Sequence, residues 1–333
     1  MSVQITRLLM DELKNRSETE LSNAIAYIID TLSSRKLTTS GPGAPIDIEL
    51  LLRSATYLAE KDKHPLSGFV SAWHAGLKTI DPSGDGLLFR RLILTTKKIL
   101  PDLLQHKKSV RYLAGINRLV SVLQNKNRCA PIVFTLNYDI CIEQALRDAN
   151  LEFTTGFKNG IWHPAEFGNQ QRIRLFKLHG SLGWVRHPER RILFDANESF
   201  QRDDILQEGP DINHEIIFAV DNKLQAAQPF LWLFQKCAEL VAQAAYVVCI
   251  GYSFRDEHVN EIIGQALAAD SNKCMVFVGP DVSENTLTET RKITFYPNRV
   301  TPIKMKAKRA LTGNAILEAL DTFESAKRGD IPF

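Results

Sequence analysis

The chain has 333 residues, of which 44% are hydrophobic and 24% charged. These fractions lie near the averages of globular proteins and exclude intrinsic disorder, a collagen-like fibre and a coiled-coil rod. The net charge of +3, from 41 basic and 38 acidic residues, gives no reason to expect direct binding of nucleic acid. Five cysteines without a C-x-x-C pair, and no apolar run long enough to cross a bilayer, predict a cytoplasmic protein with free thiols, no metal site and no membrane contact.

The first 130 residues are predicted to form a mostly helical module. Apolar residues recur at helical spacing between Ile5 and Leu13, and a second apolar stripe follows an S-x-x-E capping box at Ser17 and Glu20. Further helical patterns occupy residues 48–60, 87–100 and 109–123. We expect these helices to pack on a sheet formed by the rest of the chain.

Residues 131–333 change to alternating strands and helices. Short apolar runs typical of buried strands lie at residues 131–135, 151–155, 172–178, 215–220, 245–250 and 273–278. Helical patterns lie near residues 140–149, 228–243, 256–268 and 310–327, and residues 184–214 are polar and irregular. This alternation predicts an α/β fold with a Rossmann-like parallel sheet, in which ligands bind at the carboxyl ends of the strands.

Three short motifs follow predicted strands. In the first, T-L-N-Y-D, the residues Thr135, Asn137 and Asp139 come directly after an apolar strand and open a helix. A carboxamide such as that of Asn137 can hold a ribose hydroxyl or a water molecule. Asp139 has an equally weighted alternative role, that of capping the helix over residues 140–149.

The second motif is K-L-H-G-S-L-G-W, in which His179 ends a predicted strand. Gly180 lets a ligand approach the backbone closely. An imidazole at this place titrates near neutral pH and can act as a base. Taken alone, a histidine at a strand end is more often structural, so this motif has a structural alternative.

The third motif is G-Y-S-F-R-D-E-H, which follows the most apolar predicted strand. Gly251 and Ser253 stand where a helix begins, and a helix start can bind a phosphate through its free N–H groups and its dipole. The alternative is an S-x-x-D capping box between Ser253 and Asp256, which needs no ligand.

In this order, the three motifs resemble those of the sirtuin-like NAD-binding family, and in particular the bacterial sirtuin-like proteins of anti-phage defence. Residues 135–139, 177–181 and 251–260 match that family's T-x-N-Y-D, K-L-H-G-S and G-Y/F-S/G-F-x-D-x-H-I/V-N patterns. The segment 216–223 is similar to the family's segment between the last two motifs, and 329–333 to the ending of the subtype that pairs with a HerA-type translocase. The resemblance covers roughly residues 45 to 333 and implies a sheet of sirtuin type.

The resemblance implies an NAD+ glycohydrolase, which releases nicotinamide and ADP-ribose from NAD+. Asn137 would orient the ribose or the attacking water, and His179 would be the base. The residues that would contact the rest of NAD+ are Thr135, Asp139, Gly180, Gly251, Tyr252, Ser253 and Asp256. The resemblance also implies an anti-phage effector that forms a homo-oligomer and works with a HerA-type ATPase.

Two departures from the family pattern concern its ligand-binding parts. The family begins with a strand and a G-A-G-x-S-type loop that binds the pyrophosphate, whereas no glycine precedes Gly41 and residues 6–13 look like the helix after that loop. A start codon placed too far downstream would explain this, and so would loss of the loop, which favours a catalytically impaired scaffold for a partner ATPase. The four-cysteine zinc module of the deacylases is also missing, so we expect no zinc and no protein deacylation.

Overall fold

The structure is a computed structural model. It describes residues 2–34, 46, 48–61, 74–105, 113–127, 130–186, 192–195, 213–216, 228–254, 256–282 and 299–328. Gly41, residues 217–223 of the segment 216–223, and the segment 329–333 lie outside them. By their contacts the residues form two compact units, one of residues 1–108 and 181–221, the other of residues 109–180 and 222–333.

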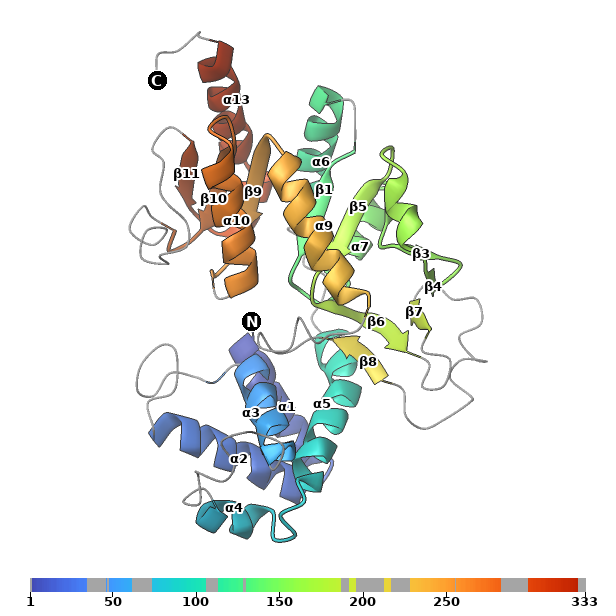
Figure 1. The fold of residues 1–333 in the computed structure, drawn as a ribbon, viewed down its shortest axis with the longest axis vertical. Helices are drawn as coiled ribbons and strands as arrows, with labels where there is room; N and C mark the ends of the chain where they lie inside the picture. The colour runs from blue at the N-terminus through green and yellow to red at the C-terminus, as the bar shows by residue number, and fades with distance from the viewer. Residues whose placement is uncertain are drawn as a thin grey trace. The chain divides into compact units, whose positions relative to one another are not determined.

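Helices dominate the described part of the first unit. They are α1 (Ser2–Asn15), α2 (Thr19–Ser34), α3 (Ile48–Ala59), α4 (His74–Ile80) and α5 (Leu87–Gln105) (Figure 1). Their apolar stripes face a common core, in which Leu9, Ile25 and Phe89 are fully buried. Helix α4 is not foreseen by the sequence pattern. The predicted capping box is wrong, because Ser17 has a φ of 58° and an N-cap residue is extended.

Three strands also belong to this unit, although β6 begins one residue before it. They are β6 (Gly180–Arg186), β7 (Leu193–Asp195) and β8 (Asn213–Ile216). Strand β6 lies between the other two and pairs antiparallel with β7, where Trp184 stands opposite Asp195. The prediction of an irregular segment over residues 184–214 is therefore wrong at these strands, because apolar side chains such as Trp184 are buried there.

The second unit contains two three-stranded parallel sheets. One has the order β1 (Ile132–Thr135), β5 (Ile173–Lys177), β2 (Phe153–Thr154), and the other β11 (Val300–Lys304), β10 (Cys274–Gly279), β9 (Tyr246–Ile250). All their pairings are parallel. The predicted α/β class with parallel strands is thus confirmed.

Helices connect these strands and flank them. They are α6 (Ala114–Asn127), α7 (Cys141–Asp148), α9 (Phe230–Gln243), α10 (Glu257–Ala269), α12 (Ala307–Thr312) and α13 (Ala315–Arg328). Helix α6 lies within the first 130 residues but packs against α7 and α12 of the second unit. The single helix expected over residues 310–327 is divided, because α12 ends at Gly313.

A short excursion between β2 and β5 carries the hairpin of β3 (Phe157–Lys158) and β4 (Ile161–Trp162) and the 3-10 helix η5 (Pro164–Gly168). Its aromatic rings pack on the sheet and on α9. Phe167 stacks on Phe176 of β5 with ring centroids 4.1 Å apart, and Trp232 of α9 lies 5.5 Å from Phe167. Aromatic packing therefore holds this excursion in place.

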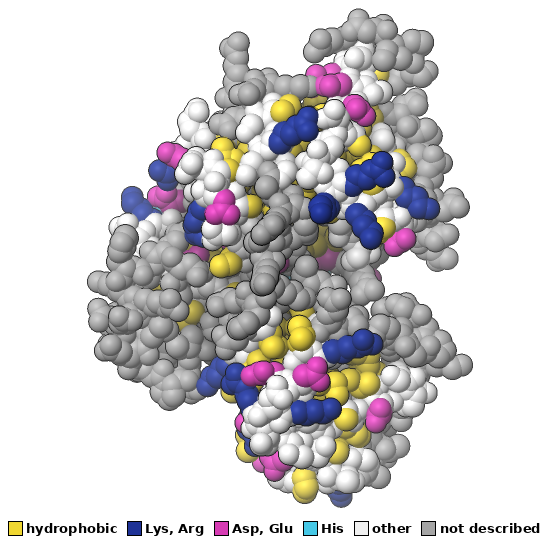
Figure 2. Space-filling model, turned by 180° about the vertical axis from the view of Figure 1, so that it is seen from behind, with side chains coloured by type: hydrophobic (Ala, Val, Ile, Leu, Met, Phe, Trp, Pro, Cys, Tyr) yellow, Lys and Arg dark blue, Asp and Glu magenta, His cyan; other side chains and the backbone are white. Residues whose placement is uncertain are grey.

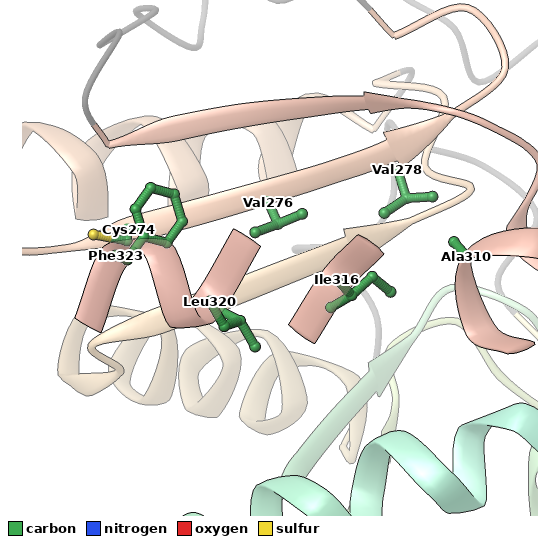
Figure 3. Packing of buried hydrophobic residues seen from close by; sticks show 7 residues of the cluster. All are labelled: Cys274, Val276, Val278, Ala310, Ile316, Leu320 and Phe323. Carbon is green, nitrogen blue, oxygen red and sulfur yellow. The ribbon is translucent and has the colours of Figure 1, made fainter. Parts of the chain in front are cut away.

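Helix α13 covers one face of the sheet formed by β9, β10 and β11. Figure 3 shows Ile316, Leu320 and Phe323 of this helix beside Val276 and Cys274 of β10. All are nearly or fully buried, and burial of an aliphatic or aromatic side chain contributes about 1.5–3 kcal/mol. This packing holds β10 in place. Strand β10 lies next to β9, and β9 carries the third motif at its end.

Charges are mixed on the described surface. On the face drawn in Figure 2, Lys and Arg side chains stand among Asp and Glu side chains, in keeping with the small net charge. Among the helices whose residues are described, none has the length and apolarity needed to span a bilayer.

Candidate active site

The three motifs follow the carboxyl ends of β1, β5 and β9, all in the second unit. Thr135 ends β1 and pairs in register with Lys177, which ends the neighbouring parallel strand β5. The N–H of Leu178 donates to the carbonyl oxygen of Thr135 at 3.0 Å, which extends the pairing past the strand end. Asn137 and His179 therefore leave one sheet at the same edge, as the sequence predicts for a ligand site.

The second and third motifs meet in a buried hydrogen bond. Nε2 of His179 lies 2.9 Å from Oδ2 of Asp256, and their side chains are 9% and 6% exposed. The two residues are 77 positions apart, so only the fold brings them together. A histidine oriented by a carboxylate is the usual arrangement of a general base.

Asp256 also caps helix α10. Its Oδ1 accepts from the N–H groups of His258 at 3.1 Å and Val259 at 3.3 Å. Asp256 is thus itself the N-cap, in the extended conformation that a cap requires. The capping-box alternative, with Ser253 as the cap, is wrong because the helix begins three residues later, and Ser253 is exposed.

Tyr252 braces the same helix start. Its hydroxyl lies 2.7 Å from Oδ1 of Asn260 and 2.9 Å from the carbonyl oxygen of Asp256. Burial raises the pKa of this phenol, and the nearby Asp256 carboxylate raises it further. The side-chain amide of Asn260 in turn donates to the carbonyl oxygen of Phe254 at 2.8 Å. Phe254 has a φ of 57°. Tyr252, Phe254 and Asp256 are thereby tied to α10.

Gly251 and Gly180 hold the backbone in conformations that favour glycine. Their φ angles are 67° and 84°. A Cβ atom built on Gly251 would have no heavy atom within 4 Å among the described residues, so space is open beside it. Gly180 thus has a backbone conformation typical of glycine where close approach was predicted. The predicted helix start at Gly251 and Ser253 is wrong, because α10 begins at Glu257 and the N–H of Gly251 donates to the carbonyl oxygen of Val278 at 2.8 Å.

The first motif forms a tight turn. The N–H of Asn137 donates to Oγ1 of Thr135 at 3.1 Å, and the Asn137 side chain is exposed. The N–H of Cys141 donates to Oδ1 of Asp139 at 2.9 Å, so this carboxylate holds the start of α7, in line with its capping alternative. Thr135 and Asp139 thus shape the turn that presents the Asn137 carboxamide.

A buried ion pair anchors this turn and is a part of the site that the three sequence motifs do not reveal. Nζ of Lys177 donates to Oε1 of Glu143 at 2.5 Å and to the carbonyl oxygen of Asp139. The side chains of Lys177 and Glu143 are 0% and 6% exposed. The lysine is visible in the sequence as part of K-L-H-G-S, but no signal marks its partner on α7.

Thiols line the neighbourhood of the site without being reactive. Burial raises the pKa of Cys141 to about 12, with Asp139 adding to it, and burial likewise raises the pKa values of Cys237 and Cys249 to about 12. The four cysteines that the structure describes are free, as predicted, and Cys129 lies outside the described residues. These thiols are therefore protonated at neutral pH.

Comparisons with known proteins identify the region that carries the three motifs. The model of the SIR2-like domain family matches residues 131–296. No curated protein matches the sequence.

Similar solved structures include one that describes the structural basis for the mechanism and regulation of Sir2 enzymes. Its sequence is 14% identical and its TM-score is 0.40, and the match covers 82% of this chain and 98% of that one. A second is Sir2Tm bound to a propionylated peptide, at 14% identity and a TM-score of 0.39, covering 73% and 80%. A third is described as Sir2 with a p53 peptide and NAD+, at 12% identity and a TM-score of 0.37, covering 76% and 80%.

Proposed function

Because residues 131–296 match the SIR2-like domain family, we propose that this protein is an NAD+ glycohydrolase. The observation that carries the proposal is the buried hydrogen bond between His179 and Asp256, at the sheet edge where Asn137 is also presented. NAD+ is then the substrate. Its ADP-ribose part would extend toward Gly251 and Ser253, where the open space beside Gly251 gives room for a ribose or phosphate.

The reaction is cleavage of the bond between ribose C1′ and the pyridinium nitrogen by water. The bonding electrons pass to the nitrogen, which leaves as neutral nicotinamide, and the transition state has oxocarbenium character at C1′, as in other glycoside cleavages. The water oxygen bonds to C1′ and gives its proton to His179. NAD+ and water thus become nicotinamide, ADP-ribose and a proton.

Each motif has a part in this step. The Asn137 carboxamide orients the ribose or the water, which supplies the proximity on which such reactions depend. Thr135 and Asp139 fix the turn that holds Asn137, and Gly180 lets the substrate approach the backbone next to His179. Tyr252 and Asp256 order the loop that carries Gly251 and Ser253.

We also propose that the activity serves anti-phage defence, in a homo-oligomer that works with a HerA-type ATPase. The support for this role is the order and spacing of the three sequence motifs. Its test is phage plating on cells that carry the gene with and without the substitution His179→Ala. Equal plating on both would contradict it.

A second candidate is a scaffold subunit that keeps the fold and binds a partner ATPase without consuming NAD+. The observation that favours it is that the N–H of Gly251, at the position predicted to bind a phosphate, donates to the carbonyl oxygen of Val278 at 2.8 Å.

Product analysis separates the candidates. Purified protein is incubated with NAD+ in 18O-labelled water, with and without an acetylated peptide. A glycohydrolase releases nicotinamide and ADP-ribose with one 18O atom at C1′ and needs no peptide. Peptide-dependent loss of NAD+ would indicate a deacylase, and no loss would favour the scaffold.

A further inference from the structure

We propose that Asp256 is a positioning residue for His179, which selects the nitrogen through which this histidine exchanges its proton. The inference rests on the proposed function insofar as it assigns His179 as the base. It goes further by giving the carboxylate at the start of α10 two simultaneous tasks, one for each of its oxygen atoms.

The two oxygens of Asp256 face different partners. Oδ1 accepts from the N–H groups of His258 and Val259, and Oδ2 lies 2.9 Å from Nε2 of His179. The helix cap therefore fixes the rotation of the carboxylate, and Oδ2 is aimed at the imidazole. The carbonyl oxygen of Asp256 also accepts from the Tyr252 hydroxyl at 2.9 Å, and this bond restrains the backbone of Asp256.

An ionised carboxylate only accepts hydrogen bonds, so the atom of His179 that faces it carries hydrogen. Neutral His179 is then the tautomer with hydrogen on Nε2 and a lone pair on Nδ1. During hydrolysis the water proton passes to Nδ1, the Nε2 hydrogen stays in place, and the carboxylate faces the resulting imidazolium. After the products leave, the Nδ1 proton passes to a water molecule that reaches this otherwise buried atom.

The substitution Asp256→Asn separates capping from positioning. Asparagine caps helices about as well as aspartate, so the helix start keeps its acceptor. Since the amide oxygen is needed by the two N–H groups of α10, the amide NH2 is left facing Nε2. An NH2 group donates, so Nε2 must accept and neutral His179 moves its hydrogen to Nδ1.

The first readout is the tautomer of His179, measured by 15N NMR on histidine-labelled protein, with the resonance assigned from the variant His179→Gln. We expect the Nε2–H form in the parent and the Nδ1–H form in Asp256→Asn. The matched control is Asp270→Asn at the other end of α10, whose carboxylate accepts from Asn272, and it should leave His179 unchanged. A parent in the Nδ1–H form, or an unaltered tautomer in Asp256→Asn, would overturn the proposal.

The second readout is kinetic. If the parent hydrolyses NAD+, Asp256→Asn should lower kcat about 10²-fold or more with KM changed less than about threefold and the melting temperature near that of the parent. Parental kcat in this variant would show that Asp256 only caps the helix. If the parent turns over no NAD+ but shows the expected tautomers, the positioning of His179 stands while the hydrolase proposal fails.

Discussion

The buried ion pair between Lys177 and Glu143 gives the most demanding stability prediction. The substitution Lys177→Met keeps a side chain of similar length but removes the ammonium group. The Glu143 carboxylate, 6% exposed, is then buried without its cation, and the Asp139 carbonyl oxygen loses a charged donor. Removing one member of a buried pair costs about 3–5 kcal/mol, so the free energy of unfolding should fall by about that amount.

The double variant Lys177→Met with Glu143→Leu tests the cause. Replacing both members by apolar side chains removes the stranded charge, and such exchanges are often neutral. Because the Asp139 carbonyl still lacks its donor, we expect the double variant to remain about 1–2 kcal/mol below the parent. The measurement is urea unfolding followed by circular dichroism, with the exposed Lys158→Met as a control that changes stability by less than about 0.5 kcal/mol. A loss below about 1 kcal/mol for Lys177→Met, or no recovery in the double variant, would refute the reasoning.

Two further substitutions test packing and helix ends. Gly156→Ala should lower the free energy of unfolding by about 1–3 kcal/mol, because φ is 88° and a Cβ would lie 2.3 Å from the Phe167 ring. At Gly168 a Cβ would meet no heavy atom within 4 Å, so Gly168→Ala should stay within about 0.5 kcal/mol of the parent. Thermal unfolding of both decides this, and equal melting temperatures would contradict it. Lys273→Met should lose roughly 2–4 kcal/mol, because the buried Nζ donates to the carbonyl oxygens of Val241, Ala242 and Ala244 at the end of α9. The control Lys236→Met removes an exposed pair with Glu239 and should lose less than about 1 kcal/mol in the same urea assay; comparable losses would count against the explanation.

The sequence predicts the strands that are apolar along their length. Strands β1, β5, β9 and β10 were all expected within two residues of their bounds, since continuous apolar runs between helical patterns are typical of parallel sheets. Strand β11 was missed because Pro302 interrupts it, and proline is tolerated there because β11 lies at an edge of its sheet. The two-residue strands β3 and β4 are too short to give a periodic signal.

The candidate site was predictable in its parts and not in its connections. His179, Asn137 and Gly251 each follow a strand, so their placement at carboxyl ends follows from the pattern. The bond between His179 and Asp256, and that between Lys177 and Glu143, join residues 77 and 34 positions apart and depend on how helices α10 and α7 dock. Local spacing even favoured the wrong cap for α10, because Ser253 and Asp256 fit a capping box that the backbone does not form.

The most direct measurement of the central claim is NAD+ turnover by the purified chain, followed by chromatography of nicotinamide and ADP-ribose. The parent is compared with His179→Ala and with His163→Ala, an exposed histidine that follows β4. We expect both products from the parent and from His163→Ala, and a rate about 10²–10⁴-fold lower for His179→Ala. No turnover by the parent, or equal turnover by His179→Ala, would contradict it.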